Sequence, residues 1–91
     1  MNKQIMYYLE IKATELLNIY YDKSFNHLWK YEQMSMLIAV IETLGRIMKE
    51  SGDRNAREYH TFKQKYEANI MIARTWCDTF YRKNYDNIEE V

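Results

Sequence analysis

The near absence of turn-forming residues is the feature that most constrains how this chain can fold. Its 91 residues include no proline and only two glycines, Gly45 and Gly52. A sheet protein of this size needs many tight turns, and such turns recruit glycine and proline. The chain must therefore consist of a few long elements, which we expect to be helices. A chain of this length forms one domain, which we place over 1–91.

Apolar residues at steps of three and four divide the chain into three predicted helices. We expect them over about 2–21, 26–50 and 54–82, followed by an acidic tail over 83–91. Gly52 suits a left-handed residue that ends a helix, and Asp53 or Asn55 can cap the next one. Because this connection is short, helices two and three should form an antiparallel hairpin. The predicted fold is all-α, a three-helix antiparallel bundle built around this long helical hairpin.

The second predicted helix is apolar around most of its circumference. Its main stripe consists of Met34, Leu37, Ile38, Ile41, Gly45 and Met48. A second stripe lies beside it and consists of Met36, Val40 and Ile47. A helix of this kind is typically buried on several sides, so we expect it to be the central helix. Gly45 should let a neighbouring backbone approach this helix closely.

The first predicted helix favours association with another protein. Its main stripe consists of Ile5, Leu9, Ala13, Leu16 and Tyr20. Further apolar residues lie off this stripe, namely Tyr7, Tyr8, Ile11 and Ile19. Helices of about 30 to 43 Å are long for a chain of this size and bury too little apolar surface on their own. We therefore expect a homodimer or a partner-bound protein. The linker from Asp22 to Asn26 allows the first helix to pack on its own hairpin or to exchange with another chain.

Aromatic residues gather at the end of the predicted hairpin that lies opposite Gly52. Nine of them fall there, including Phe25 in the linker, and the candidate anchors of a binding surface are Trp29, Tyr31, Trp76 and Tyr81. Tyrosine and tryptophan are enriched at binding hot spots. The competing interpretation is an aromatic core layer that closes one end of the bundle. Nine rings cannot all be buried at one pole, so some of them should be exposed.

The charge balance argues against a dedicated nucleic-acid binder. Thirteen basic residues match thirteen acidic ones. The only local basic excess surrounds the predicted hairpin turn, where phosphate contacts are conceivable through Arg54, Arg57, Lys63 and Lys65. Solvated helix ends also carry such charges, and Arg46 and Lys49 suit the negative carboxyl end of helix two.

No pattern of catalytic or metal-binding residues is evident. Phosphate loops, zinc-protease motifs and nucleophile elbows have no counterpart in the chain, and no cofactor is expected. His27 and Cys77 fall at one level of the hairpin, but a metal would also need Asp22 and Asp78, whose directions are unknown. Cys77 is expected to be a core residue. A lone cysteine and the lack of a long apolar run favour a cytoplasmic protein that does not span a membrane.

These observations favour a non-catalytic protein-protein interaction module. The residue types with AT-rich codons dominate the composition, which is typical of phages and mobile elements. A more specific hypothesis is therefore a protein that binds and inhibits a host defence protein. Two alternatives are a small nucleic-acid-associated regulator that uses the basic tip and a self-assembling structural subunit.

Overall fold

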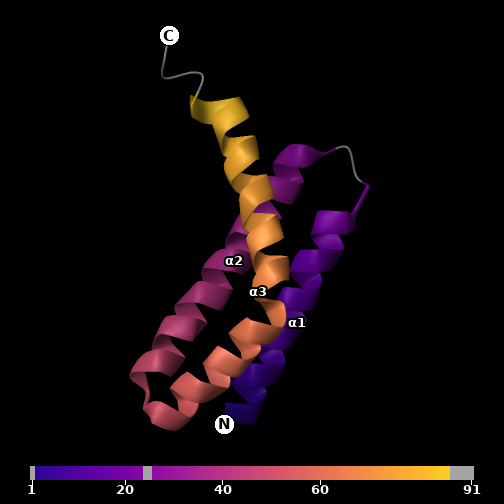
Figure 1. The fold of residues 1–91 in the computed structure, drawn as a ribbon. Helices are drawn as coiled ribbons and strands as arrows, with labels where there is room; N and C mark the ends of the chain where they lie inside the picture. Colours follow the sequence, from indigo (N-terminus) through magenta and orange to yellow (C-terminus); the bar gives the residue numbers. More distant parts are fainter. Residues whose placement is uncertain (1, 24–25, 87–91) are drawn as a thin grey trace.

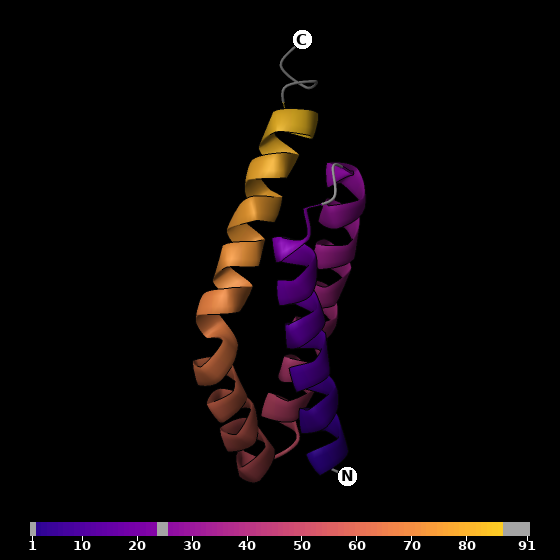
Figure 2. The same ribbon diagram turned by 90° about the vertical axis from the view of Figure 1, so that its right-hand side faces the viewer.

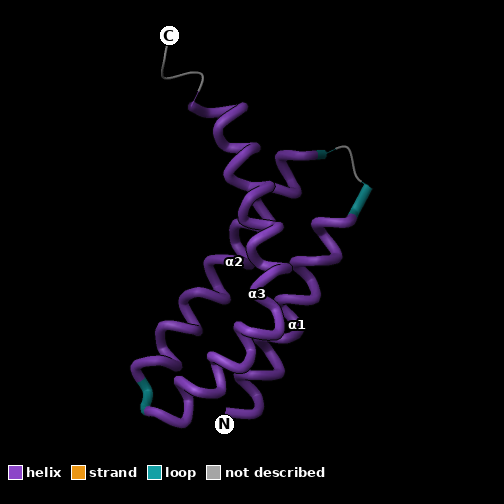
Figure 3. Tube along the Cα trace, viewed as in Figure 1, coloured by secondary structure: helices purple, strands orange, loops and turns teal. Residues whose placement is uncertain are grey.

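A computed structural model describes residues 2–23 and 26–86 and contains three long helices (Figure 1). They are α1 (Asn2–Tyr21), α2 (His27–Glu50) and α3 (Asp53–Tyr81), and a short π-helical segment, η1 (Arg82–Asp86), follows α3. The described residues contain no strand (Figure 3). All three helices contact one another, and α1 packs on its own hairpin. The predicted all-α three-helix bundle is thereby confirmed.

The amino ends of α2 and α3 differ in how they are capped. Asn26 caps α2, because its side-chain Oδ1 accepts a hydrogen bond of 2.9 Å from the backbone N–H of Trp29. At α3 the expectation was wrong: Asp53 is already the first helical residue, and no side chain caps this end. Gly52 precedes it with φ 117°, a conformation that glycine adopts without steric cost.

Helical structure continues beyond the predicted end of the third helix, although α3 itself ends at Tyr81. Residues 82–86 form the π-helical turn, and the side-chain amide of Asn84 donates a 2.8 Å hydrogen bond to the carbonyl of Phe80. An acidic tail from Lys83 was therefore wrong for 83–86, because ring contacts of Tyr85 hold this turn against the bundle. The remainder of the predicted tail, 87–91, lies outside the described residues.

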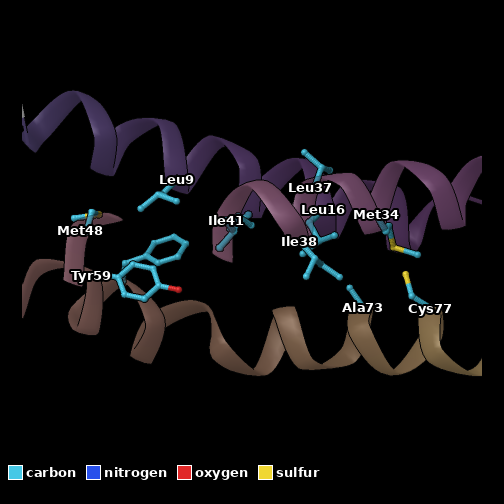
Figure 4. Close-up of a cluster of buried hydrophobic side chains, with 12 residues drawn as sticks. Leu9, Leu16, Met34, Leu37, Ile38, Ile41, Met48, Tyr59, Ala73 and Cys77 are labelled. Atoms are coloured by element: carbon cyan, nitrogen blue, oxygen red, sulfur yellow. The ribbon is translucent and has the colours of Figure 1, made fainter. Parts of the chain in front are cut away.

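The hydrophobic core runs along the bundle axis and draws on all three helices. Its best enclosed large side chains are Leu9, Leu16, Met34 and Ile41, each fully buried. Figure 4 shows Tyr59 near one end of this core and Cys77 beside Met34 towards the other. Within the described ranges, no helix combines the length and the hydropathy needed to cross a membrane.

The expectation that α2 is a central helix was wrong. Met36 and Ile47, from its second apolar stripe, are 54% and 51% exposed. In a bundle of three helices each helix has two neighbours, so one side of every helix faces solvent. On α1, Ile19 packs against the core instead of standing free, whereas Tyr7 and Ile11 are exposed as expected.

Gly45 does permit a close approach to α2. The approaching group is a side chain, so the prediction of a neighbouring backbone was wrong. The ring of Tyr59 lies against the Gly45 backbone, and an added Cβ would lie only 2.6 Å from its Cε1 atom. Tyr59 is a core residue that is only 6% exposed. The missing side chain at Gly45 is therefore what allows α3 to place a tyrosine in the core at this level.

Candidate functional site

Helix α3 is the longest element, and its carboxyl end projects past α1 and α2 (Figures 1 and 2). Aromatic side chains from the start of α2 meet side chains from the end of α3 at this pole. We call this group the aromatic cluster, and it consists of His27, Tyr31, Trp76, Phe80, Tyr81 and Tyr85.

The rings of the aromatic cluster form a continuous row. Phe80 stacks on Trp76 at 5.4 Å between ring centroids and on Tyr31 at 5.0 Å. His27 meets Trp76 edge to face at 5.9 Å, and Tyr85 lies 6.1 Å from Tyr31. Offset-stacked and edge-to-face pairs each stabilise by about 0.5–1.5 kcal/mol beyond the burial of their area. The row therefore holds the projecting end of α3 on the first turns of α2.

Three of the four predicted anchors belong to this cluster. Tyr31 and Trp76 are half-buried within the row, and Tyr81 is 43% exposed at its end, 5.3 Å from Tyr85. Trp29 is 42% exposed and contacts no other ring in the described part of the chain. Phe25 lies outside the described residues. The cluster thus combines a packed layer with an exposed margin.

Lys30 organises this pole, and sequence reasoning missed it. Its side chain is 7% exposed, and its Nζ donates to the carbonyls of Tyr20 at 3.0 Å and Asp22 at 2.9 Å. The same Nζ lies 5.4 Å from the ring centroid of Trp76. One ammonium therefore caps the carboxyl end of α1, whose terminal carbonyls attract cations, and also contacts α3. The signal in the sequence was the position of Lys30, which lies on the same helix face as Met34 and the rest of its apolar stripe.

Burial also sets the chemistry of two groups near the cluster. Burial raises the pKa of the Cys77 thiol, although hydrogen bonding from Ser35 opposes this shift. Partial burial likewise raises the pKa of Tyr31, again against an opposing hydrogen bond from Ser35. At neutral pH both groups keep their protons, so Cys77 is a packed side chain rather than an activated nucleophile.

Two grooves meet at Trp76 and Thr79. The first lies between the end of α1 and α3, has a volume of about 410 Å³, and is lined by Tyr20, Met71, Ile72, Thr75, Trp76 and Thr79. The second has a volume of about 470 Å³ and lies between the start of α2 and the end of α3, where Leu28 and Phe80 contribute apolar surface. We call the first one the Trp76 groove. None of its lining side chains is charged, and Met71 and Ile72 are 55% and 40% exposed.

The four basic residues predicted for nucleic-acid contact do not share one surface. Arg54 pairs with Glu58 at 3.6 Å, and Arg57 is exposed on the same helix. Lys65 faces α1, where the Glu10 carboxylate lies 3.5 Å away and raises the pKa of Lys65. Lys63 points to the other side of α3.

Lys63 instead joins Arg46 and Lys49 around a separate pocket of about 320 Å³ between α2 and α3. Sequence reasoning had counted these two α2 residues in the basic region around the hairpin turn, with the helix dipole as the competing interpretation of their charge. The pocket also contains acidic residues, because Glu67 lines it and Glu42 pairs there with Arg74. The positive charge at this place is therefore partly compensated.

The described residues bring no three histidine, cysteine, aspartate or glutamate side chains together as metal ligands. His27 packs on Trp76, whereas Cys77 lies beside Met34 in the core (Figure 4). The hypothetical pairing of His27 with Cys77 thus has no support in the arrangement of their side chains.

The fold and these surfaces define a small three-helix bundle with an aromatic pole and an uncharged groove beside it. Comparison with protein-family models, with curated proteins and with solved structures found no match.

Proposed function

We propose that this protein is a non-catalytic protein-binding module, and that its partner binds in the Trp76 groove. The observation that carries this proposal is the uncharged lining of the groove, with Met71 and Ile72 left exposed beside a fixed aromatic ring. Exposed apolar surface next to aromatic anchors is typical of protein interaction sites. The stacked row behind Trp76 holds that ring in place, which lowers the entropic cost of binding.

The chemistry of the groove favours an apolar segment of the partner. Its threonine hydroxyls, from Thr75 and Thr79, can hydrogen-bond at the margins, while no fixed charge selects a counter-ion. A groove between two helix surfaces suits an amphipathic helix that inserts its apolar face. The second groove extends this surface towards Leu28, which is 46% exposed.

Ile72→Asp tests this proposal, with Gln64→Asp as the matched control. Both positions are exposed on α3, and Gln64 lies about two turns from the groove. The tagged chain and both variants would be used to purify associated proteins from cells under identical conditions. A partner that is retained by the control and lost by Ile72→Asp supports the proposal. A partner that is recovered equally with all three proteins contradicts it.

The more specific proposal is that the partner is a host defence protein, which the module inhibits. Its support is the small size of the chain and a composition dominated by residue types that have AT-rich codons. If it holds, expression of the chain should restore phage growth on bacteria that carry the relevant defence system, and Ile72→Asp should abolish this effect. Unchanged restriction of phage across a panel of defence systems would contradict the inhibitor role.

A second candidate function is phosphate binding by the cations of the α2–α3 pocket. The observation that favours it is the convergence of Arg46, Lys49 and Lys63 from two helices. A gel-shift assay at low salt checks it, because phosphate contacts weaken steeply as salt rises. A shift that Lys63→Gln abolishes would support a nucleic-acid-associated regulator, and no shift at low salt would eliminate it.

A further inference from the structure

An uncharged stripe runs along the solvent-facing side of α2. Its positions follow alternating steps of four and three, which is the spacing of a coiled-coil seam, and are Trp29, Gln33, Met36, Val40, Thr43 and Ile47. Met36 and Ile47 are 54% and 51% exposed, and Trp29 is 42% exposed. We call this stripe the α2 seam. It is about 27 Å long at the rise of an α-helix.

The bundle itself does not use the α2 seam. The core side of α2 carries Met34, Leu37, Ile38, Ile41 and Met48 instead. The groove beside the seam is bordered by α1 through Tyr8 and otherwise by side chains of α2, none of which is charged. A surface helix with a second apolar stripe at heptad spacing presents that stripe to another helix.

We propose that the α2 seam binds the α2 seam of a second copy of this chain, with the two helices antiparallel. In an antiparallel coiled coil, each seam residue packs in a layer with one residue of the other helix. One register pairs every position of this seam. It places Trp29 against Ile47 of the second copy, Gln33 against Thr43, and Met36 against Val40.

This register is chemically self-complementary. The two polar positions of the seam, Gln33 and Thr43, fall in the same layers and can hydrogen-bond to each other. The apolar positions likewise meet only apolar ones. Ala39 flanks the seam at the two-fold axis, where a small side chain lets the helices approach closely.

Charges beside the seam favour the same register. Glu32 and Arg46 flank the seam on the same edge as Ala39, seven residues to either side of it. The antiparallel register therefore places Glu32 of each copy opposite Arg46 of the other, twice across the interface. Both side chains are exposed, and neither forms an ion pair within the described residues. A parallel arrangement would bring Glu32 next to Leu37 and Arg46 next to Ser51, with no such pairing. Flanking charges of this kind set partner choice and orientation in coiled coils.

This interface is separate from the Trp76 groove and does not depend on the function proposed above. The seam lies on the solvent side of α2, whereas the groove lies between α1 and α3. Ile72→Asp should therefore leave the association of two copies unchanged, and a dimer can present two grooves.

Charge reversal tests the proposal in the full chain by light scattering over a dilution series. We expect the unaltered chain to show twice its 11.2 kDa mass. Glu32→Arg and Arg46→Glu each place two like-charge pairs across the interface, so each should weaken the dimer at least tenfold. The double variant restores opposite charges and should return to within threefold of the unaltered chain. A monomer at millimolar concentration, or a double variant as weak as the single ones, overturns the proposal.

A distance measurement tests the direction of the helices. Spin labels on Glu50→Cys, in a Cys77→Ala background, should lie roughly 36 Å apart along the helix axis in the antiparallel dimer. A parallel dimer would bring them to about the interaxial spacing of packed helices, near 10 Å. The short distance would overturn the antiparallel register. Circular dichroism of each variant checks that the helices are retained, and Val40→Asp provides an independent disruption of the seam.

Discussion

At the scale of single residues, Lys30 shows how one side chain can tie three helices together. Its ammonium donates hydrogen bonds to the carbonyl of Tyr20, in the last turn of α1, and to that of Asp22, just after it. The last carbonyls of a helix have no hydrogen-bond partner within the helix itself. Its hydrocarbon stem is buried, so the lysine contributes apolar contact as well as charge. Hydrogen bonds from a charged donor are stronger than neutral ones, which makes this residue a larger contributor than its polar type suggests.

Lys30→Met should therefore lower the free energy of unfolding by about 1.5–3 kcal/mol, the usual range for hydrogen bonds to a charged group. Methionine keeps most of the stem but removes the ammonium. The measurement is urea unfolding followed by circular dichroism. Lys49→Met is the control, because Lys49 is exposed. Its Nζ lies 5.5 Å from the ring centroid of Tyr59, which is a weaker kind of contact than the two hydrogen bonds of Lys30. Equal losses for both variants would show that the buried position of Lys30 has no special role.

Gly45 and Tyr59 form a second pair in which one residue makes room for the other. In an ordinary helix interior, alanine is more stable than glycine by about 1 kcal/mol. Here the added methyl group would overlap the buried ring of Tyr59. Overpacking of this kind costs about 1–3 kcal/mol. After the propensity gain of about 1 kcal/mol is subtracted, Gly45→Ala should destabilise the protein by up to about 2 kcal/mol.

The sign of this effect should reverse when the ring is removed. In a Tyr59→Leu background the overlapping ring atoms are gone, so Gly45→Ala should stabilise by up to about 1 kcal/mol. A double-mutant cycle measured by urea unfolding gives the coupling between the two positions. Identical effects of Gly45→Ala in both backgrounds would contradict a direct contact between the ring and the backbone.

The buried Cys77 should make stability depend on alkaline pH. Its pKa is raised in the folded state, chiefly by burial, so the folded protein holds this proton more tightly than the unfolded chain does. The stabilising effect is complete below the pKa of an unfolded cysteine, about 8.5, and is lost as the pH rises through the folded-state value. Burial of Tyr59 raises its pKa too and adds a further loss above about 10, the ordinary tyrosine value.

The free energy of unfolding should therefore fall as the pH is raised above about 8.5, the ordinary cysteine pKa. Urea unfolding across an alkaline pH series measures this, with Cys77→Ala as the comparison. The variant lacks the titrating thiol, so the first part of its decline should be shallower. Parallel pH curves for both proteins would show that the thiol does not contribute.

At the scale of elements, α2 and α3 differ in how their surfaces are used. Helix α3 has a charged exterior with paired side chains, such as Arg54 with Glu58 and Arg74 with Glu42 of α2. The exterior of α2 instead carries the uncharged seam from Trp29 to Ile47. This contrast is the reason why the proposed contact with a second copy of the chain is at α2.

Aromatic contacts, rather than the axial core of the bundle, stabilise the carboxyl end of α3. This end projects past α1 and α2 (Figure 2), and ring contacts of Phe80 and Tyr85 with Tyr31 join it to the first turns of α2. The π-helical turn at 82–86 places Tyr85 against Tyr31 and Tyr81, which explains why helical structure continues beyond the apolar repeat.

At the scale of the whole molecule, the structure measures 48 × 28 × 19 Å and carries its two candidate surfaces in different places. The Trp76 groove lies between α1 and α3, and the α2 seam lies on the outer side of α2. An elongated bundle with a thin core leaves much apolar surface exposed, because a short chain has a high ratio of surface to volume. The proposed association with a second copy would remove part of that surface from water.

The sequence alone determined the number, type and approximate bounds of the helices. Turn residues are almost absent, so the breaks at Asp22–Asn26 and at Gly52 were visible as interruptions of a strong periodicity. Periodicity also identified Leu9, Leu16 and Ile41 as core residues, because these positions repeat along one helix face.

Tertiary structure alone decided which of two apolar stripes on α2 is buried. Both stripes satisfy helical periodicity, and only the positions of α1 and α3 distinguish Met34 from Met36. The same applies to Trp29, which shares a pole with Trp76 in the sequence pattern but faces solvent on another side of α2. The partners of Lys30 and Gly45 also depend on distant segments, since a local pattern does not specify which atoms of another helix lie opposite a residue. Periodicity in the sequence indicates in which direction a side chain points from the axis of its own helix. Contacts between helices depend on how the axes of different helices are placed in space.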